Sequence, residues 1–235
     1  MIIFYSPDIA TCPELDEEES GHVVRVLRHK EGDELVIVDG EGNYYHTHIV
    51  SAHHKHCAVE IDRIEAENHW PYHVEIAVAP TKNLDRMEWF LEKATEMGLD
   101  RFVPIKCRFS ERKELKTERM KKIAVSAMKQ SLKATLPVIE EMVDIKTYLK
   151  EDFDGQKFIA HCFKDSPRKL LSKEIKQGSK VRILIGPEGD FSEEEVNLAI
   201  ENGYTPISLG EQRLRTETAA LASVHTIHII NELSQ

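Results

Sequence analysis

The sequence contains no apolar run long enough to span a bilayer, since its longest apolar stretches, such as VEIAVAP, have the length of a strand. Its first residues, MIIFYSPD, place no basic region ahead of an apolar segment, so we expect no secretory signal peptide. These absences predict a soluble, cytoplasmic protein with no membrane partner.

Cysteine is scarce, and the four cysteines at positions 12, 57, 107 and 162 form no CxxC pair. Their spacing favours reduced, mostly buried thiols over a disulfide framework or a zinc site. Several histidines lie near Cys57 on a predicted hairpin, but solvated surface histidines are the more common outcome of such a pattern, so we expect no metal. These histidines are His46, His48, His53, His54 and His56.

The common nucleotide-binding loops are also missing. No GxGxxG follows a predicted strand, since GEGNYY lies in a hairpin, and no GxxxxGK[ST] occurs. Phosphate binding of the nucleotide-triphosphatase type is therefore excluded.

The net charge of −10 by itself argues against a nucleic-acid partner, but the charge is unevenly distributed. Residues 101–133 carry eleven basic and three acidic residues, a local charge of +8 against −18 for the rest of the chain. Because salt limits the reach of each charge to about 10 Å, a basic face on an acidic protein still attracts phosphate. A solvated helix face with internal ion pairs has the same composition, so charge alone leaves both interpretations open.

The first 70 residues read as short strands without long helices, which is typical of a small β-barrel. DELVIVDGEGNYYHTHIV predicts a strand, a turn and a strand, and KHCAVEIDRIE predicts another strand. The acidic stretch ELDEEES is expected to be a surface segment before a short helix around Val23–Leu27. Trp70-Pro71 is the predicted domain boundary.

Residues 71–235 alternate strands with helices, which predicts an α/β domain with a mainly parallel sheet. Helices are expected over residues 84–98, 118–132 and 217–233, and a capping box of Ser192 and Glu195 should start another. The predicted strands are YHVEIAVAP, RFVPI, KFIAHCF, VRILIG and PISLG. The first helix should bury Met87, Phe90, Leu91, Ala94 and Met97 and stop at Gly98.

Ligands of parallel sheets bind beyond the carboxyl ends of the strands, where the two most unusual segments of this chain lie. LIGPEGDFSEEE places Gly186-Pro187-Glu188-Gly189 after a strand. LGEQRLRTETAAL places Gly210 and an arginine-rich loop before a helix that Thr216 or Thr218 is expected to cap. We expect both loops to form one pocket of glycine-rich backbone, suited to a cofactor recognised by its adenine and methionine parts. Its charged groups would be Arg213, Arg215, Glu188 and Glu217.

Over nearly its whole length the chain resembles the ribosomal RNA small subunit methyltransferase E family of the knotted SPOUT superfamily. HVVRVLRHKEGDELVIVDG resembles the family's PUA-like domain. DRMEWFLEKATEMGLDRFVPI, RFSERK, KQSLKATLPVI and the two glycine-containing segments then follow in the family's order. The chain departs from the family pattern at Asp190 and Leu132, where members usually carry glycine, and at Gln212 and Lys133, where they usually carry arginine.

The resemblance implies a PUA-like β-barrel over residues 1–70 and a SPOUT α/β domain with a trefoil knot over residues 71–235. It also implies a homodimer that uses S-adenosylmethionine to methylate uridine N3 in 16S ribosomal RNA of the small ribosomal subunit. The predicted cofactor-binding residues are Ile185, Gly186, Pro187, Glu188, Gly189, Leu209, Gly210, Leu214, Arg215, Thr216, Thr218 and Ala219.

Arg215 is the predicted catalytic cation, because negative charge spreads over the uracil ring as the N3 proton leaves. Glu188 or Glu217 would accept that proton or hold the donor's amino group. An ion pair between Arg215 and Glu217 that only shapes the loop is the alternative. The predicted RNA-binding residues are Arg25, Arg28, Arg108, Arg112, Lys129 and Lys133.

Two other functions fit the same residues. One is methylation of a ribose 2′-hydroxyl, and the other is non-catalytic RNA binding during ribosome assembly.

Overall fold

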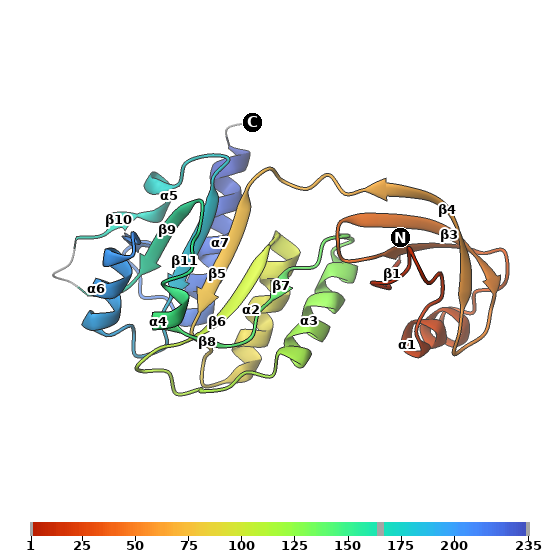
Figure 1. The fold of residues 1–235 in the computed structure, drawn as a ribbon, viewed down its shortest axis with the longest axis horizontal. Coiled ribbons are helices and arrows are strands. Elements are labelled where there is room, and N and C mark those ends of the chain that lie inside the picture. Colours follow the sequence, from red (N-terminus) through yellow and green to blue (C-terminus); the bar gives the residue numbers. More distant parts are fainter. Residues whose placement is uncertain (1, 164–166, 234–235) are drawn as a thin grey trace. The chain divides into compact units, whose positions relative to one another are not determined.

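The computed structural model describes residues 2–163 and 167–233, which form two compact units (Figure 1). The first unit contains the residues up to His69 together with Ala124–Leu136, and the second contains Trp70–Ile123 and the residues from Pro137 onward. Helix α3 (Thr117–Gln130) starts in the second unit and ends in the first. The first unit is therefore built from two separate segments of the chain.

A four-stranded sheet with the order β1-β2-β3-β4 forms the first unit. β1 runs parallel to β2, and the other neighbours are antiparallel, which confirms the predicted hairpin. In the turn between β2 and β3, Gly40 and Gly42 have positive φ angles, and the Asp39 carboxylate accepts the backbone N–H of Glu41. The strands are β1 (Ile3–Tyr5), β2 (Glu34–Val38), β3 (Asn43–Ser51) and β4 (Ala58–Ala66).

The acidic segment, expected to be a surface segment before a short helix, itself contains the start of that helix. α1 (Glu17–Gly21) begins after Asp16, whose side chain accepts the backbone N–H of Glu19. A π-helical turn, η1 (His22–Val26), continues it. Carboxylates in the first turn stabilise a helix through its dipole, which explains why this acidic segment is helical.

The second half of α3 completes the core of the first unit, where Met128 packs with Ile3 and Val38. The helix ends at Gln130, two residues before the predicted end. Leu132 then has a φ of 57°, in the left-handed region, where a side chain costs about 1–2 kcal/mol. This is one of the positions where the resembled family carries glycine.

The second unit contains an eight-stranded sheet with the order β10-β12-β9-β11-β5-β6-β7, and β8 pairs with β6. Every strand pairing in the described part of this sheet is parallel, which confirms the α/β prediction. The carboxyl ends therefore share one edge, toward which the arrowheads of β5 and β9 point in Figure 1. The strands are β5 (His73–Val78), β6 (Arg101–Lys106), β7 (Val138–Ile139), β8 (Val143–Asp144), β9 (Gln156–Ala160), β10 (Lys169–Leu170), β11 (Lys180–Ile185) and β12 (Thr205–Ser208).

Helices cover both faces of this sheet. α7 (Thr216–Glu232) packs on β5 and β11, with α2 (Leu84–Met97) and α5 (Leu171–Glu174) beside it. α4 (Ile145–Tyr148) and α6 (Glu193–Glu201) contribute to the hydrophobic cluster on the other face. α2 stops at Gly98 as predicted, but Met97 is 39% exposed and was wrongly placed on its buried face.

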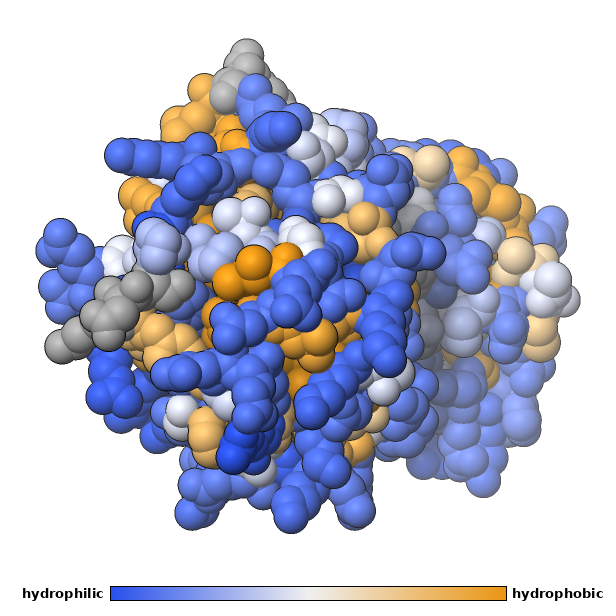
Figure 2. All heavy atoms as spheres, turned by 60° about the vertical axis from the view of Figure 1, so that its left-hand side comes forward, coloured by the Kyte–Doolittle hydropathy of each residue, from blue (hydrophilic) through white to orange (hydrophobic). Residues whose placement is uncertain are grey.

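The surface is mostly hydrophilic, as the negative mean hydropathy of the sequence leads one to expect (Figure 2). On the face that Figure 2 shows, hydrophilic side chains dominate, and hydrophobic ones form scattered areas between them. None of the helices in the described residues has both the length and the apolar character needed to cross a membrane. Of the four cysteines, Cys57 and Cys107 are buried, whereas Cys12 and Cys162 are exposed, so the expectation of mostly buried thiols is correct for two.

A buried ion pair joins the two central strands of the second unit. Arg182 of β11 is 1% exposed, and its Nε lies 2.8 Å from Oε1 of Glu75, its register partner on β5. The rings of Tyr148 and Phe153 lie 4.6 and 4.4 Å from the guanidinium carbon. In the sequence, VRILIG reads as a simple apolar strand, and nothing in that pattern indicates this pair. Because an unpaired buried charge is costly, the pair favours this register of β5 and β11 over others.

Burial alone raises the pKa of Glu75. Hydrogen bonds from His73 and Tyr148 lower it, and the charges of Arg182 and Arg101 lower it further, so the pKa falls to about 2. A carboxylate with a lowered pKa stabilises the folded state above its ordinary pKa of 4.5. That contribution is lost as the pH falls from 4.5 toward 2.

We expect Glu75→Gln to destabilise the second unit by about 3–5 kcal/mol at pH 7, because the Arg182 charge stays buried without its carboxylate. The difference in unfolding free energy between wild type and variant should shrink by about 2 kcal/mol between pH 6 and pH 3. Urea unfolding followed by the fluorescence of Trp70 and Trp89, both in the second unit, measures this difference.

Glu151→Gln is the matched control, since Glu151 is a half-exposed partner of the same arginine, 3.5 Å away, and should matter little at either pH. An equal loss for Glu75→Gln at pH 6 and pH 3 would show that Glu75 has no lowered pKa.

Candidate functional site

The two glycine-containing loops follow strands at the carboxyl edge of the sheet in the second unit. β11 leads into Gly186, and β12 leads into Leu209. β9 lies between these strands, with Ala160 paired to Ile185 on one side and to Ile207 on the other. Neighbouring strands are about 4.8 Å apart, so the two loops start about 10 Å from each other.

A buried hydrogen bond joins the two loops. The Thr216 hydroxyl donates to the carbonyl oxygen of Gly186 at 3.1 Å. This corrects the expectation that Thr216 or Thr218 caps α7. The N-cap residue is Arg215, which makes no side-chain capping bond, because the Thr216 hydroxyl binds the other loop and Thr218 is exposed. The prediction that both loops build one site is consistent with this contact.

Neighbouring loops hold the glycine loop in place, and this explains its two glycines. The Glu188 carboxylate accepts the backbone N–H of Lys82, in the loop after β5, at 2.9 Å. A Cβ at Gly186 would lie 3.1 Å from the ring and the backbone nitrogen of Phe191, and one at Gly189 would lie 3.2 Å from the Cβ of Phe109. Both glycines therefore permit close packing.

Asp190 takes the place of a glycine and adds a contact. Its φ is 67°, a left-handed conformation that aspartate tolerates better than most residues. Its carboxylate accepts the backbone N–H of Cys162 at 2.7 Å and that of Phe191 at 2.8 Å. The departure from the family pattern thus ties the segment after β9 to the glycine loop.

His161, which was not among the predicted site residues, follows β9 directly, between the strands that lead into the two loops. The ring is 3% exposed, and burial lowers its pKa, with a smaller effect of Arg168 in the same direction and an opposing effect of Asp190. Nδ1 accepts the backbone N–H of Phe163 at 3.2 Å, which assigns the proton to Nε2. This Nε2 has no hydrogen-bond partner among the described residues. Its position at the carboxyl end of a strand was the available signal.

The predicted catalytic residues differ in their surroundings. Arg215 is exposed, and its guanidinium forms no hydrogen bond or ion pair with the described residues. Glu217 is 7% exposed and faces Arg86 of α2, with Oε1 3.8 Å from Nε. The alternative ion pair between Arg215 and Glu217 is therefore not formed. Glu217 Oε2 is buried without a hydrogen-bond partner among the described residues.

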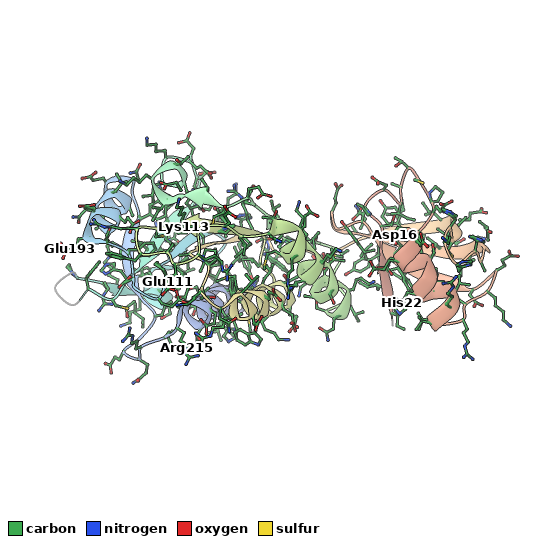
Figure 3. All side chains as sticks on the ribbon, turned by 90° about the horizontal axis from the view of Figure 1, so that it is seen from below. Asp16, His22, Glu111, Lys113, Glu193 and Arg215 are labelled. Atoms are coloured by element: carbon green, nitrogen blue, oxygen red, sulfur yellow. The ribbon has the colours of Figure 1, made fainter. Side chains whose placement is uncertain are left out.

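A surface hollow of about 450 Å³ adjoins the glycine loop, since one of its lining residues is Lys82, which binds Glu188. Figure 3 looks onto this edge of the second unit and shows Glu111, Lys113 and Arg215 on it. The hollow is lined by Lys82, Glu111, Arg112, Lys113 and Glu114.

The predicted RNA-binding residues of the second unit are already engaged within the protein. The Arg108 guanidinium lies 3.0 Å from the Glu194 carboxylate in an exposed ion pair. Arg112 donates to the carbonyl oxygens of Thr81 and Lys82 at 3.2 and 2.8 Å. Arg112 thus holds the loop after β5 in addition to any role toward RNA.

In the first unit, Arg25 and Arg28 are exposed and form no hydrogen bond or ion pair with the described residues. Lys129 pairs with the buried carboxylate of Glu19, and Lys133 is half-buried and also interacts within the protein. Two of the six predicted residues, Arg25 and Arg28, are therefore available for phosphate without breaking an internal contact.

Several histidines of the first unit pair with acidic residues. His46 lies 3.2 Å from Glu65, and His48 lies 2.9 Å from Asp62. The described residues contain no group of three or more histidine, cysteine or acidic side chains arranged to hold a metal ion.

Known proteins resemble this chain over both units. Residues 68–228 match the RNA methyltransferase domain family, and residues 15–62 match the RNA methyltransferase PUA domain family, so the N-terminal unit is PUA-like. The ribosomal RNA small subunit methyltransferase E of Bacillus subtilis (strain 168) is 30% identical over 230 residues, which cover 92% of this chain and 89% of that protein.

Two solved structures extend the similarity. The probable rRNA-methyltransferase from Porphyromonas gingivalis superimposes with a TM-score of 0.93 and 42% identity over the whole of both chains. A putative methyltransferase from Legionella pneumophila, solved in complex with the bound cofactor S-adenosylmethionine, superimposes with a TM-score of 0.85 and 27% identity over 97% of each chain. These similarities agree with the family that the motifs indicate.

We expect Thr216→Val to loosen the glycine loop, because it removes the hydroxyl that binds the Gly186 carbonyl and leaves that carbonyl buried. Losing such a bond costs about 1–3 kcal/mol, so amide exchange at residues 186–190 should speed up about 5- to 100-fold. Hydrogen exchange followed by mass spectrometry measures this rate. Thr216→Ser keeps the hydroxyl and is the matched control. Equal exchange in the valine and serine variants would show that the bond does not hold the loop.

Proposed function

Since this chain belongs to the ribosomal RNA small subunit methyltransferase E family, we propose that it transfers a methyl group from S-adenosylmethionine to N3 of a uridine in 16S ribosomal RNA. The observation that carries the proposal is the buried contact between Thr216 and Gly186, which joins the two loops predicted to bind the cofactor. Ribosomal RNA as the substrate makes the cytoplasm the proposed location.

The residues of the joined loops fit this cofactor. Its methionine part carries an amino group, and Glu217 offers a buried carboxylate oxygen that has no partner among the described residues. Backbone of the Gly186–Gly189 and Leu209–Gly210 segments would hold the adenosine part. Bound there, the cofactor supplies an electrophilic methyl group on a sulfonium. The remaining proposed contacts are Ile185, Leu214, Thr218 and Ala219.

The protein has to make uridine N3 nucleophilic, because this nitrogen carries a proton in the neutral base. As the proton leaves, negative charge spreads onto O2 and O4 of the ring. Arg215, whose guanidinium is unpaired within the described chain, stabilises that charge, and Arg213 in the same loop offers a second cation. Most of the remaining rate enhancement comes from positioning the cofactor and the base, since methyl transfer is an in-line displacement.

Glu188 is the proposed proton acceptor. It is exposed at the glycine loop, and only Oε1 is engaged, by the backbone N–H of Lys82. Glu217 is buried and faces Arg86, which suits it to hold the cofactor instead. This assignment gives the two carboxylates separate roles.

Three structural features belong to the same proposal. They are closure of the first unit into a barrel, a trefoil knot in which α7 passes through a preceding loop, and assembly as a homodimer. The contact between the start of α7 and the loop after β11 supports the knot, because a threaded helix has to pass close to that loop.

We expect Arg215→Ala to lower methyl transfer about 100-fold or more, because the charge on the uracil ring loses its cation. Affinity for S-adenosylhomocysteine should stay within about threefold of wild type, because Arg215 is proposed to act on the substrate. Glu211→Ala changes an exposed residue of the same loop and is the control.

Methyl transfer is measured by nuclease digestion of treated small ribosomal subunits and mass spectrometry of the nucleosides. Calorimetry measures the affinity for S-adenosylhomocysteine. Normal turnover by Arg215→Ala would refute the role of Arg215. A 2′-O-methylated nucleoside as the only product would refute base methylation. Absence of any methylated nucleoside from wild type would leave a non-catalytic RNA-binding protein.

RNA affinity should fall steeply as salt rises, because phosphate contacts release counterions. The double variant Arg25→Ala/Arg28→Ala should reduce the slope of log affinity against log salt by about 1 for each arginine removed. Arg63→Ala is the control, since that exposed arginine of the first unit pairs with Glu65 at 2.7 Å. Filter binding to small-subunit RNA at several salt concentrations tests this, and an unchanged slope in the double variant counts against both arginines.

A further inference from the structure

One aromatic ring stands exposed beside the candidate site. Phe109 follows β6 at the carboxyl edge of the sheet and is 49% exposed. Five of the eight phenylalanines are at most 2% exposed, so this ring is unusual among them. Its place beside the candidate site gives a ligand apolar surface to cover, which is favourable.

The turn that carries Phe109 is tightly held. The Ser110 backbone N–H donates to the carbonyl oxygen of Cys107 at 3.1 Å, and the Ser110 hydroxyl accepts the backbone N–H of Cys107 at 2.9 Å. Cys107 is buried in the core of the second unit. Exposure of the ring is therefore a property of a fixed turn.

A second set of contacts fixes this turn against the segment that follows the glycine loop. The backbone N–H of Arg108 donates to Oε1 of Glu195 at 2.7 Å. The other oxygen of that carboxylate accepts the backbone N–H of Ser192 at 2.8 Å, as part of the capping box of α6. One carboxylate thus sets the position of both segments.

Phe109 directly borders the glycine loop. A Cβ on Gly189 would lie only 3.2 Å from the Cβ of Phe109, so the absence of a side chain at Gly189 lets the turn approach. The Arg108 guanidinium lies 5.7 Å from the centre of the Phe109 ring. Its ion pair with Glu194 is exposed and weak, which leaves it able to exchange that partner for a phosphate. An aromatic surface and a cation thus occur together at this edge.

A ring and a cation together match a nucleotide that has left its helix. Uridine N3 is covered in a base pair, so the base has to leave the stack before it reacts. The flipped base loses its stacking neighbours, and an exposed aromatic side chain restores part of that energy for any base. The phosphate of the same nucleotide would lie close to the Arg108 guanidinium.

We propose that Phe109 is a positioning residue on which the target uracil stacks after it leaves the RNA helix. The inference rests on the proposed function, since it names the protein surface that receives the substrate base. Stacking orients the uracil ring but does not distinguish it from other bases. Phe109 therefore contributes to the rate more than to the choice of base.

The test is a series at one position, with Phe109→Ala, Phe109→Leu and Phe109→Trp assayed on small ribosomal subunits that lack the modification. Alanine and leucine should each lower the rate at saturating substrate about 5- to 100-fold, since neither stacks. Tryptophan should restore it to within about threefold of wild type. Affinity for S-adenosylhomocysteine, the melting temperature and the molecular mass in solution should stay the same in all variants.

Several outcomes overturn the inference. Full activity of the leucine variant shows that apolar contact suffices, and full activity of the alanine variant shows that the ring is dispensable. A parallel fall in affinity for S-adenosylhomocysteine assigns the ring to the cofactor, and a change in mass assigns it to contact between subunits. Formation of N3-methyluridine by wild type separates these results from a failure of the proposed function, in which wild type itself yields no such product.

Discussion

The candidate site depends on the buried hydrogen bond from the Thr216 hydroxyl to the Gly186 carbonyl. β11 and β12 are separated by β9, so the loops that follow them start about two strand spacings apart and have to bend toward each other to meet. Glycine at 186, which leaves room for Phe191, and threonine at the start of α7 make that meeting possible. Asp190 and Glu188 then tie the same loop to the segments after β9 and β5.

The interior of the same sheet contributes stability and not a binding surface. Arg182 and Glu75 lie in register on the two central strands, and the aromatic rings of Tyr148 and Phe153 enclose the guanidinium. This pair sits among buried strands, where an unpaired charge would be costly, so it specifies how β5 and β11 align. Alignment of these strands in turn fixes where the loops after them begin. The interior strands thus provide stability, and the loops at their carboxyl edge form the candidate site.

Much of the fold and the place of the site could be predicted from the sequence, because they depend on local patterns. Alternating strands and helices, the stop at Gly98 and the capping box at Ser192 are each determined by residues close in sequence. Arg182 was missed because a single charge in an apolar run gives no sign of a partner over a hundred residues away. Thr216 was read as a helix cap, since only tertiary structure shows that its hydroxyl is used by another loop. His161 and Phe109 depend in the same way on which segments the sheet brings together.

The central claim is that the two joined loops bind one adenosyl ligand. A crystal of the protein grown with S-adenosylhomocysteine tests this claim most directly, because the ligand's position is seen without assuming any reaction. We expect density for the adenosyl group in contact with both the Gly186–Gly189 segment and the loop that precedes α7, with the ligand's amino group beside Glu217. Density elsewhere on the protein, or contact with only one of the two loops, would contradict the account.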